Sequence, residues 1–155
     1  MSARLRDLAV EDLPHVWRLL EQVFAEYGFA DKLAGVEDDV RESRARYAAP
    51  RAGFWVADDG GTVVGTVAIR PEHGPTCELK RLYLQPGQRG RGLGQALYEH
   101  AEAFARAAGY ERVRLVSSRR FAEAHRLYRR NGFVLVERID NDWEDDVFQK
   151  ELGAE

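Results

Sequence analysis

The sequence predicts an α/β (α+β) domain in which a mixed sheet carries helices on its faces. Some segments repeat apolar residues at helical spacing, and others alternate apolar with polar residues or form short apolar runs. These segments follow one another in the order β-α-α-β-β-β-α-β-α-β-β. The chain has 155 residues, of which 45% are hydrophobic and 32% charged, enough for one hydrophobic core. We therefore expect a single domain over residues 1–155, with about seven strands and about four helices.

The first half of the chain supplies six of these elements. They are a strand over 4–9, helices over 13–27 and 36–47, a hairpin of strands over 54–57 and 62–69, and a strand over 77–84. Glu11 and Asp12 precede the first helix, where negative charge is favourable. The turn Asp58-Asp59-Gly60-Gly61 separates the hairpin strands, as expected for a tight connection.

The second half alternates strands and helices before it ends in two strands. The expected elements are a helix over 93–108, a strand over 113–116, a helix over 122–131, and strands over 133–136 and 147–152. Gly109 and Gly132 follow the two helices. Glycine is common just past the end of a helix because it accepts a left-handed conformation there.

Charge, cysteine content and hydropathy narrow the function classes. The net charge of −3 gives no overall attraction to nucleic acid or to an anionic membrane. Cys77 is the only cysteine, so no intrachain disulfide can form, which is typical of a reducing compartment. No apolar run has the length of a signal peptide or a membrane helix. We expect a cytoplasmic protein without a membrane or nucleic-acid partner.

The stretch Leu84–Leu97, LQPGQRGRGLGQAL, is rich in glycine and arginine. It does not match a dinucleotide fingerprint, because the sixth residue counted from Gly90 or Gly92 is not glycine. It does not match a P-loop either, because Gly92 is followed by Leu93 rather than by Lys and a hydroxyl residue.

The physical basis of an anion site is nevertheless present. Glycines let backbone N–H groups approach an anion closely, and the helix expected from Leu93 directs its free N–H groups and its positive end at the same loop. Residues 79–98 contain four cations and no carboxylate. We predict a site for a pyrophosphate or a similar anion. The alternatives are a solvated loop and an RNA-binding RGRG segment, which the net acidity disfavours.

Two blocks of the sequence carry a family resemblance. Residues 89–94 read RGRGLG after a strand that ends in LYLQP, and residues 124–133 read AHRLYRRNGF. Together, and in this order among alternating strands and helices, they resemble the two motifs of the GNAT superfamily of N-acetyltransferases. The resemblance implies a GNAT-like mixed, mostly antiparallel sheet. It also implies acetyl-CoA as acyl donor and a strand 82–84 that splays from strand 113–116.

The resemblance implies which residues bind coenzyme A. Backbone amides of residues 89–94 would hold its pyrophosphate, and the edge of residues 82–84 would pair with the amides of its pantetheine arm. Phe121 stands where many members place an asparagine that contacts the cofactor, so Ser117 or Ser118 is expected to supply that polar contact. The resulting set is Leu82, Tyr83, Leu84, Arg89, Gly90, Arg91, Gly92, Leu93, Gly94 and Ser118.

Acetyl transfer to an amine requires removal of a proton from the amine and protonation of the departing thiolate. By the resemblance, Glu78 is the candidate base, acting directly or through water, and Tyr128 is the candidate acid. The alternatives are that Glu78 pairs with Lys80 or with a neighbouring strand, and that Tyr128 only packs on an apolar helix face. His125 is interpreted as a surface or packing residue, and Cys77 as a packed thiol on the strand face opposite Glu78.

The expected activity is therefore transfer of an acetyl group to a primary amine of a small molecule or peptide. The alternative is a catalytically silent acyl-CoA-binding regulatory module. No spacing of His, Cys, Asp or Glu suggests a metal site, so we expect none. The acidic runs 37–39 and 140–146 favour a cationic acceptor, unless they are only solvated surface. A homodimer is expected because dimers are frequent among such proteins.

Overall fold

A computed structural model describes residues 3–48 and 50–153, and its strands form one sheet in the order β1-β2-β3-β4-β5-β7-β6. The strands are β1 Arg4–Asp7, β2 Gly53–Asp59, β3 Thr62–His73, β4 Thr76–Leu84, β5 Arg112–Ser118, β6 Val134–Arg138 and β7 Asp145–Glu151. The α-helices are α1 Leu13–Glu26, α2 Glu37–Arg41, α3 Ser43–Arg46, α4 Leu93–Ala107 and α5 Ala122–Arg130. Short 3₁₀ helices cover Val10–Asp12, Ala30–Val36 and Pro86–Gln88.

The sheet is mixed and mostly antiparallel, as predicted. The β4–β5 pair is parallel, and the other adjacent pairs among the described strands are antiparallel. A parallel pair needs a crossover connection, and α4 supplies it on the way from β4 to β5.

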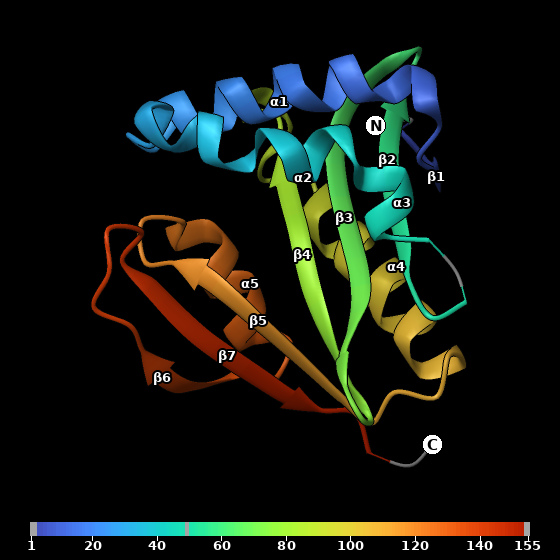
Figure 1. Ribbon diagram of the computed structural model, residues 1–155, viewed down its shortest axis with the longest axis vertical. Coiled ribbons are helices and arrows are strands. Elements are labelled where there is room, and N and C mark those ends of the chain that lie inside the picture. Colours follow the sequence, from blue (N-terminus) through green and yellow to red (C-terminus); the bar gives the residue numbers. More distant parts are fainter. Residues whose placement is uncertain (1–2, 49, 154–155) are drawn as a thin grey trace.

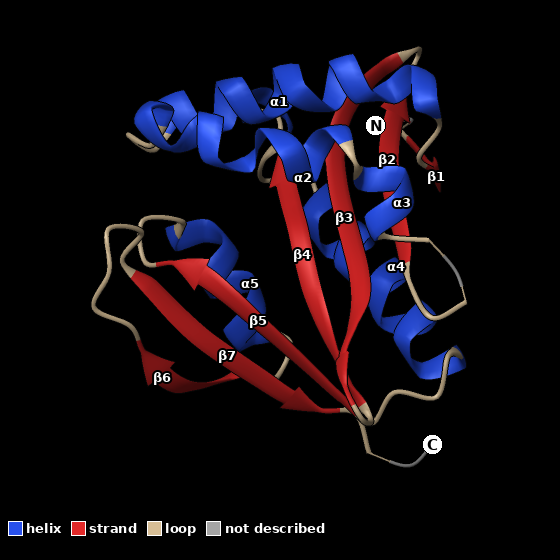
Figure 2. Ribbon diagram, viewed as in Figure 1, coloured by secondary structure: helices blue, strands red, loops and turns tan. Residues whose placement is uncertain are grey.

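Two apolar clusters lie on opposite faces of this sheet. On one face α1 buries Val16, Leu20 and Phe24, and α2 lies beside α1 (Figure 2). On the other face α4 and α5 contribute Leu97 and Leu127 to the second cluster. A helix with one apolar side buries that side and leaves the other in water. No helix within 3–48 or 50–153 has the length and apolar character needed to span a membrane.

The second predicted helix is interrupted. The sequence predicts one helix over 36–47, whereas the chain forms α2 and α3 on either side of Glu42. The buried hydroxyl of Ser43 donates to the carbonyl of Val40 at 2.7 Å and reaches that of Asp39 at 3.0 Å. A serine hydroxyl that bonds a preceding carbonyl competes with helical hydrogen bonding, which accounts for the break.

β4 and β5 pair only at their lower ends. Their register covers Thr76↔Arg112, Cys77↔Val113 and Glu78↔Arg114, and the described pairing stops there. Beyond Glu78, β4 stays with β3 while β5 stays with β7, so the two strands diverge (Figure 1). The opening that the family resemblance implies between these strands is present.

A bulge in β4 lies inside this opening. Thr66 pairs with Tyr83 and Ala68 pairs with Lys80, so β4 has one residue more than β3 over this step. Arg81 takes up the extra residue with a φ of 59°, a left-handed conformation that costs a non-glycine residue about 1–2 kcal/mol.

Two contacts hold Arg81 in this conformation. Its carbonyl accepts a hydrogen bond from the Thr66 hydroxyl at 2.6 Å, and its guanidinium donates to Asp39 at 2.6 and 2.9 Å. Burial alone would raise the pKa of Asp39, but the Arg81 guanidinium outweighs it and holds that pKa below its usual value. α2 is thereby tied to the bulge.

We expect Arg81→Ala to destabilise the protein more than Arg81→Gly does. Both variants lose the ion pair with Asp39, but glycine adopts the left-handed backbone without strain and should recover about 1 kcal/mol. Urea unfolding of the two variants measures the difference. Equal free energies of unfolding would contradict the assignment of strain to this residue.

Candidate functional site

The opening between β4 and β5 forms a cleft of about 690 Å³. Most of the residues predicted from the sequence line it. They are Glu78, Leu82, Tyr83, Leu84, Arg89, Gly90, Gly92, Gly94, Ser117, Ser118, Phe121 and Tyr128. Two predicted residues do not: Leu93, the first residue of α4, is buried in the core, and Arg91 is exposed.

The glycine-rich loop leads into α4 at one end of the cleft. Gly90 and Gly92 have φ values of 77° and 80°, which non-glycine residues rarely adopt. Gly92 is the residue before α4, and no side chain within residues 3–48 or 50–153 caps the helix there. The N–H groups of the first turn are thus available to an anion. The side-chain oxygen of Gln88, which belongs to this loop, is buried and has no hydrogen-bond partner among the described residues.

The two arginines of the loop have different positions. Arg89 pairs with Glu26 of α1, donates to the carbonyl of Leu84 at 3.0 Å, and lies 5.3 Å from the centre of the Tyr27 ring. Arg89 therefore anchors the loop to α1. Arg91 forms no ion pair with any described residue and is exposed. That the side chain of Arg91 binds a pyrophosphate together with the loop amides stays a prediction.

Two glycines allow α4 to approach the sheet closely. A Cβ on Gly65 of β3 would lie 2.8 Å from Leu97 of α4, closer than carbon atoms can pack. A Cβ on Gly94 would lie 3.3 Å from both Leu84 of β4 and Leu127 of α5. The first turn of α4 is consequently held against the open end of β4, where the strand edge enters the cleft.

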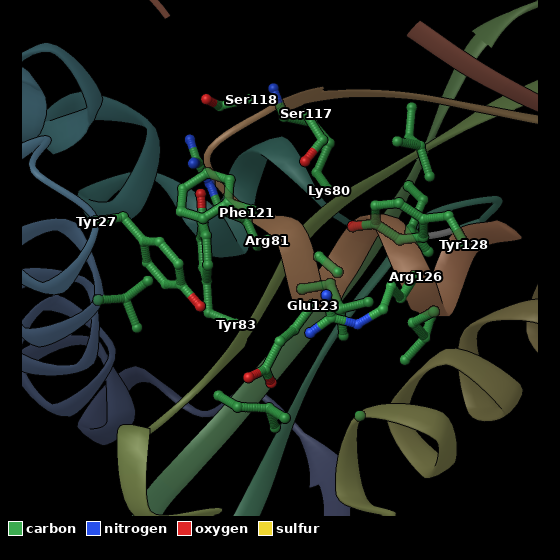
Figure 3. Close-up of a pocket in the computed structure, with 18 of the residues that line it drawn as sticks. Tyr27, Lys80, Arg81, Tyr83, Ser117, Ser118, Phe121, Glu123, Arg126 and Tyr128 are labelled. Atoms are coloured by element: carbon green, nitrogen blue, oxygen red, sulfur yellow. The ribbon is translucent and has the colours of Figure 1, made fainter. Parts of the chain in front are cut away.

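Tyr128 faces the cleft from α5. Its side chain is buried, and its hydroxyl points toward the middle of the cleft, opposite Tyr27, Tyr83 and Phe121 (Figure 3). Burial raises the pKa of Tyr128, while a hydrogen bond with Ser117 opposes that rise. The phenol therefore keeps its proton at neutral pH.

A chain of polar contacts runs behind Tyr128. The Ser117 hydroxyl lies 3.2 Å from Nε2 of His125, whose Nδ1 lies 4.0 Å from Asp146. Asp146 in turn accepts a hydrogen bond from Arg119 at 2.8 Å. Burial lowers the pKa of His125, so its ring is neutral at pH 7. His125 is buried and its ring lies 4.9 Å from that of Phe148, so the packing interpretation is confirmed and the surface one is wrong. The sequence does not predict the polar contacts, because Ser117 and Asp146 come from β5 and β7.

Glu78 lies where β4 and β5 begin to diverge. Its Oε1 accepts a hydrogen bond at 3.1 Å from Nε of Arg70, the residue on β3 that pairs with Glu78 in the sheet. The pairing of Glu78 with a neighbouring strand, one of the two alternatives, is therefore present, although the residue also lines the cleft. Cys77 points to the opposite face, as expected, and burial raises the pKa of its thiol to about 12.

Phe121 belongs to an aromatic cluster rather than to a polar contact. Its ring lies 4.9 Å from Tyr27, 5.7 Å from Phe29 and 6.1 Å from Tyr83, measured between centroids. The Ser118 hydroxyl accepts a hydrogen bond from the Arg120 amide at 3.1 Å and so stabilises the turn before α5. That Ser117 or Ser118 contacts the cofactor stays a prediction.

Arg120 joins three elements next to the aromatic cluster of Phe121. It donates to Glu144 at 2.7 Å and to the carbonyl of Gly28 at 3.1 Å, and its guanidinium lies 4.4 Å from the centre of the Phe29 ring. The end of α1, the β5–α5 turn and the β6–β7 loop thus meet at one residue. Among the described residues, no three His, Cys, Asp or Glu side chains are grouped as metal ligands would be.

Comparison with known proteins gives consistent results. A sequence profile described as the acetyltransferase (GNAT) family matches residues 15–133. The uncharacterized N-acetyltransferase YjgM of Escherichia coli is 38% identical over 141 residues, covering 88% of this chain and 84% of its own. An uncharacterized N-acetyltransferase of Schizosaccharomyces pombe is 33% identical over 82% of this chain and 79% of its own.

Solved structures show the same fold. A GNAT-family acetyltransferase of Staphylococcus aureus superposes with a TM-score of 0.90 at 15% identity, over 98% of this chain and all of the other. The PaiA N-acetyltransferase of Thermoplasma acidophilum, solved with coenzyme A, gives a TM-score of 0.72 at 23% identity, over 97% and 99% of the two chains. With the profile match over most of its length and these relatives, the chain belongs to the GNAT family of acetyltransferases.

Proposed function

We propose that this protein is an acetyl-CoA-dependent N-acetyltransferase that moves the acetyl group directly to a primary amine. The observation that carries the proposal is the cleft, which has free helix amides at its open end and the hydroxyl of Tyr128 and the carboxylate of Glu78 along its length. Solved relatives that carry coenzyme A or acetyl-CoA in their complexes support the choice of donor.

The donor fits the cleft in one direction. The amides of residues 89–94 and the side chain of Arg91 hold the pyrophosphate, and the edge of β4 at residues 82–84 pairs with the pantetheine arm as an added strand would. Acetyl-CoA supplies the acetyl group as a thioester. This arrangement directs the thioester away from the loop and toward the part of β4 that carries Glu78.

Glu78 accepts the proton that the amine must lose, directly or through a water molecule. A protonated amine has no lone pair for attack, so this proton has to leave before the N–C bond forms. The ion pair with Arg70 keeps the Glu78 carboxylate in one place, and its second oxygen takes the proton. The proton then passes to solvent at the mouth of the cleft.

Tyr128 donates a hydrogen bond to the sulfur that leaves as the C–S bond breaks. The pKa of a phenol already lies above that of a thiol, and burial raises the pKa of Tyr128 further. Full transfer of its proton to sulfur is therefore unfavourable, and the hydrogen bond itself stabilises the negative charge that builds there. The products are an N-acetyl amine and the free thiol of coenzyme A. An acceptor that starts as an ammonium loses two protons: one leaves through Glu78 to solvent and the other ends on the thiol, so each transfer releases one proton.

The acceptor predicted from the acidic runs is a cationic amine. Four of the eight acids in these runs pair with arginine: Asp38 with Arg41, Asp39 with Arg81, Glu144 with Arg120, and Asp146 with Arg119. Asp145 lines the cleft and accepts a hydrogen bond from Asn141. A cationic acceptor therefore stays a proposal, supported by Asp145.

A cytoplasmic location and a homodimer are also proposed. The outer strand β6 exposes Val134, Leu135 and Val136, at 60%, 39% and 49% of their surfaces. Exposed apolar residues on an edge strand are a surface that a second chain can cover. This strand supports the homodimer.

Glu78→Gln and Tyr128→Phe should each lower kcat by about 10²-fold, the size expected for a lost proton-transfer group. Affinity for coenzyme A should be retained, because neither residue lies at the loop that holds the pyrophosphate. The measurement is release of free thiol with a panel of amines, with calorimetric titration of coenzyme A as the control. Wild-type protein that binds acetyl-CoA but releases no thiol with any amine would instead support the silent regulatory module.

Gly92→Ala should weaken binding of coenzyme A by about 5- to 30-fold, since alanine at a positive φ costs about 1–2 kcal/mol and draws the loop out of the conformation that presents its amides. Gly87→Ala is the matched control, because Gly87 lies in the same loop without a positive φ and has open space where a Cβ would lie. Equal affinities of the two variants would argue against the loop as the pyrophosphate site.

A further inference from the structure

Lys80 is a cation in the cleft that the proposed reaction does not use. It follows Glu78 by two residues on β4, is half-buried, and lines the cleft (Figure 3). No described carboxylate forms an ion pair with it. The two acids whose charges act on Lys80 are already engaged, Glu78 with Arg70 at 3.1 Å and Asp39 with Arg81 at 2.6 Å. This face of β4 therefore carries one positive charge in excess.

A half-buried ammonium without an anionic partner is costly. Burial lowers the pKa of Lys80, against the opposing effect of Glu78. A bound carboxylate would remove this cost. Arg126 and Arg130 also line the cleft, but both are exposed residues of α5, where water solvates them.

The phosphates of coenzyme A are not the partner of Lys80. From Lys80 to Gln85, where the glycine-rich loop begins, the strand extends roughly 15 Å at about 3.3 Å per residue. Lys80 lies on the same face of β4 as Glu78, because residues two apart on a strand share a face. Their cross-strand partners on β3, Ala68 and Arg70, are also two residues apart. Lys80 thus lies at the acceptor end of the cleft.

The spacing of Glu78 and Lys80 limits the acceptor. Side chains two residues apart on one strand face are separated by about 7 Å. This distance accommodates an acceptor whose amine and carboxylate are separated by one or two carbons. The amine would hydrogen-bond to Glu78 and the carboxylate to Lys80. Tyr27, Tyr83 and Trp143 line the same cleft, and their rings provide an apolar wall for a side chain.

We propose that the acceptor is an α-amino acid, or an amine with an equally close carboxylate, whose apolar or aromatic side chain packs against the aromatic wall while Lys80 binds the carboxylate. This inference rests on the proposed acetyltransferase activity and names its substrate class. The chemistry is unchanged: the amine nitrogen forms the bond to the acetyl carbon, and the carboxylate does not react.

The test compares amino acids with the amines that lack only the carboxylate. The pairs are phenylalanine with phenethylamine, tryptophan with tryptamine, and leucine with isoamylamine, and spermidine represents cationic acceptors. Thiol release gives kcat/KM for each. A charge-assisted hydrogen bond of about 1.5–3 kcal/mol predicts that the wild-type protein favours the amino acid of at least one pair by roughly 10- to 100-fold.

Two variants assign that preference to Lys80. Lys80→Met removes the charge and keeps the stem, so it should raise KM for the amino acid by the same factor and leave kcat/KM for the amine within about twofold. Lys80→Arg keeps the charge and should retain most of the preference. Unchanged affinity for coenzyme A in both variants shows that the cleft is intact.

The outcomes separate the two proposals. Equal use of amino acid and amine by the wild-type protein, or better use of spermidine, overturns the carboxylate inference and leaves the acetyltransferase proposal standing. A preference that survives Lys80→Met overturns the role of Lys80. If Lys80→Met does not fold, the wild-type comparison still decides the substrate class. Absence of thiol release with every acceptor overturns the proposed function itself, and this inference with it.

Discussion

The course of β4 along the cleft depends on the conformation of Arg81. A left-handed arginine inside a strand is unfavourable by itself, and it persists because Thr66 binds its carbonyl while Asp39 of α2 binds its guanidinium. Four residues earlier on the chain, Cys77 still pairs with β5, and after Glu78 that pairing has ended. In the opening, β4 therefore has a bulge and an edge that does not pair with β5. Its Arg81 side chain also binds α2.

An opening in the middle of a sheet leaves backbone groups without partners, and these are the groups that a ligand can use. The edge of β4 and the first turn of α4 present amides to one cleft, and a ligand with amides and phosphates complements both. Gly65 and Gly94 have no side chains that would keep α4 away from β3, β4 and α5. The first turn of α4 can therefore lie at that edge of β4. The cleft is therefore a consequence of how the sheet is divided.

Ion pairs between arginine and the carboxylates of Asp or Glu organise the rest of the cleft. Arg89 holds the loop to α1 through Glu26, Arg120 joins the α1 end to the β6–β7 loop, and Arg119 neutralises the buried Asp146. Each pair leaves little net charge behind. The acidity expected around the acceptor is reduced in this way, and Lys80 becomes the prominent charge beside Glu78. The acidic residues thus predict an acidic rim when only the sequence is known, but those that pair with arginine add little net charge in the folded protein.

The sequence by itself determined the order of elements, the two motif blocks, the glycine-rich loop before α4 and the opposite faces of Cys77 and Glu78, because periodicity and turn residues are local properties of the chain. Only the tertiary structure decided that residues 36–47 form two helices, that Phe121 joins an aromatic cluster, that Arg89 binds α1, and that His125 stands between Ser117 and Asp146. These outcomes depend on contacts between segments far apart in the chain. Local pattern identifies which residues can bind or react, but only packing decides which partner each of them meets.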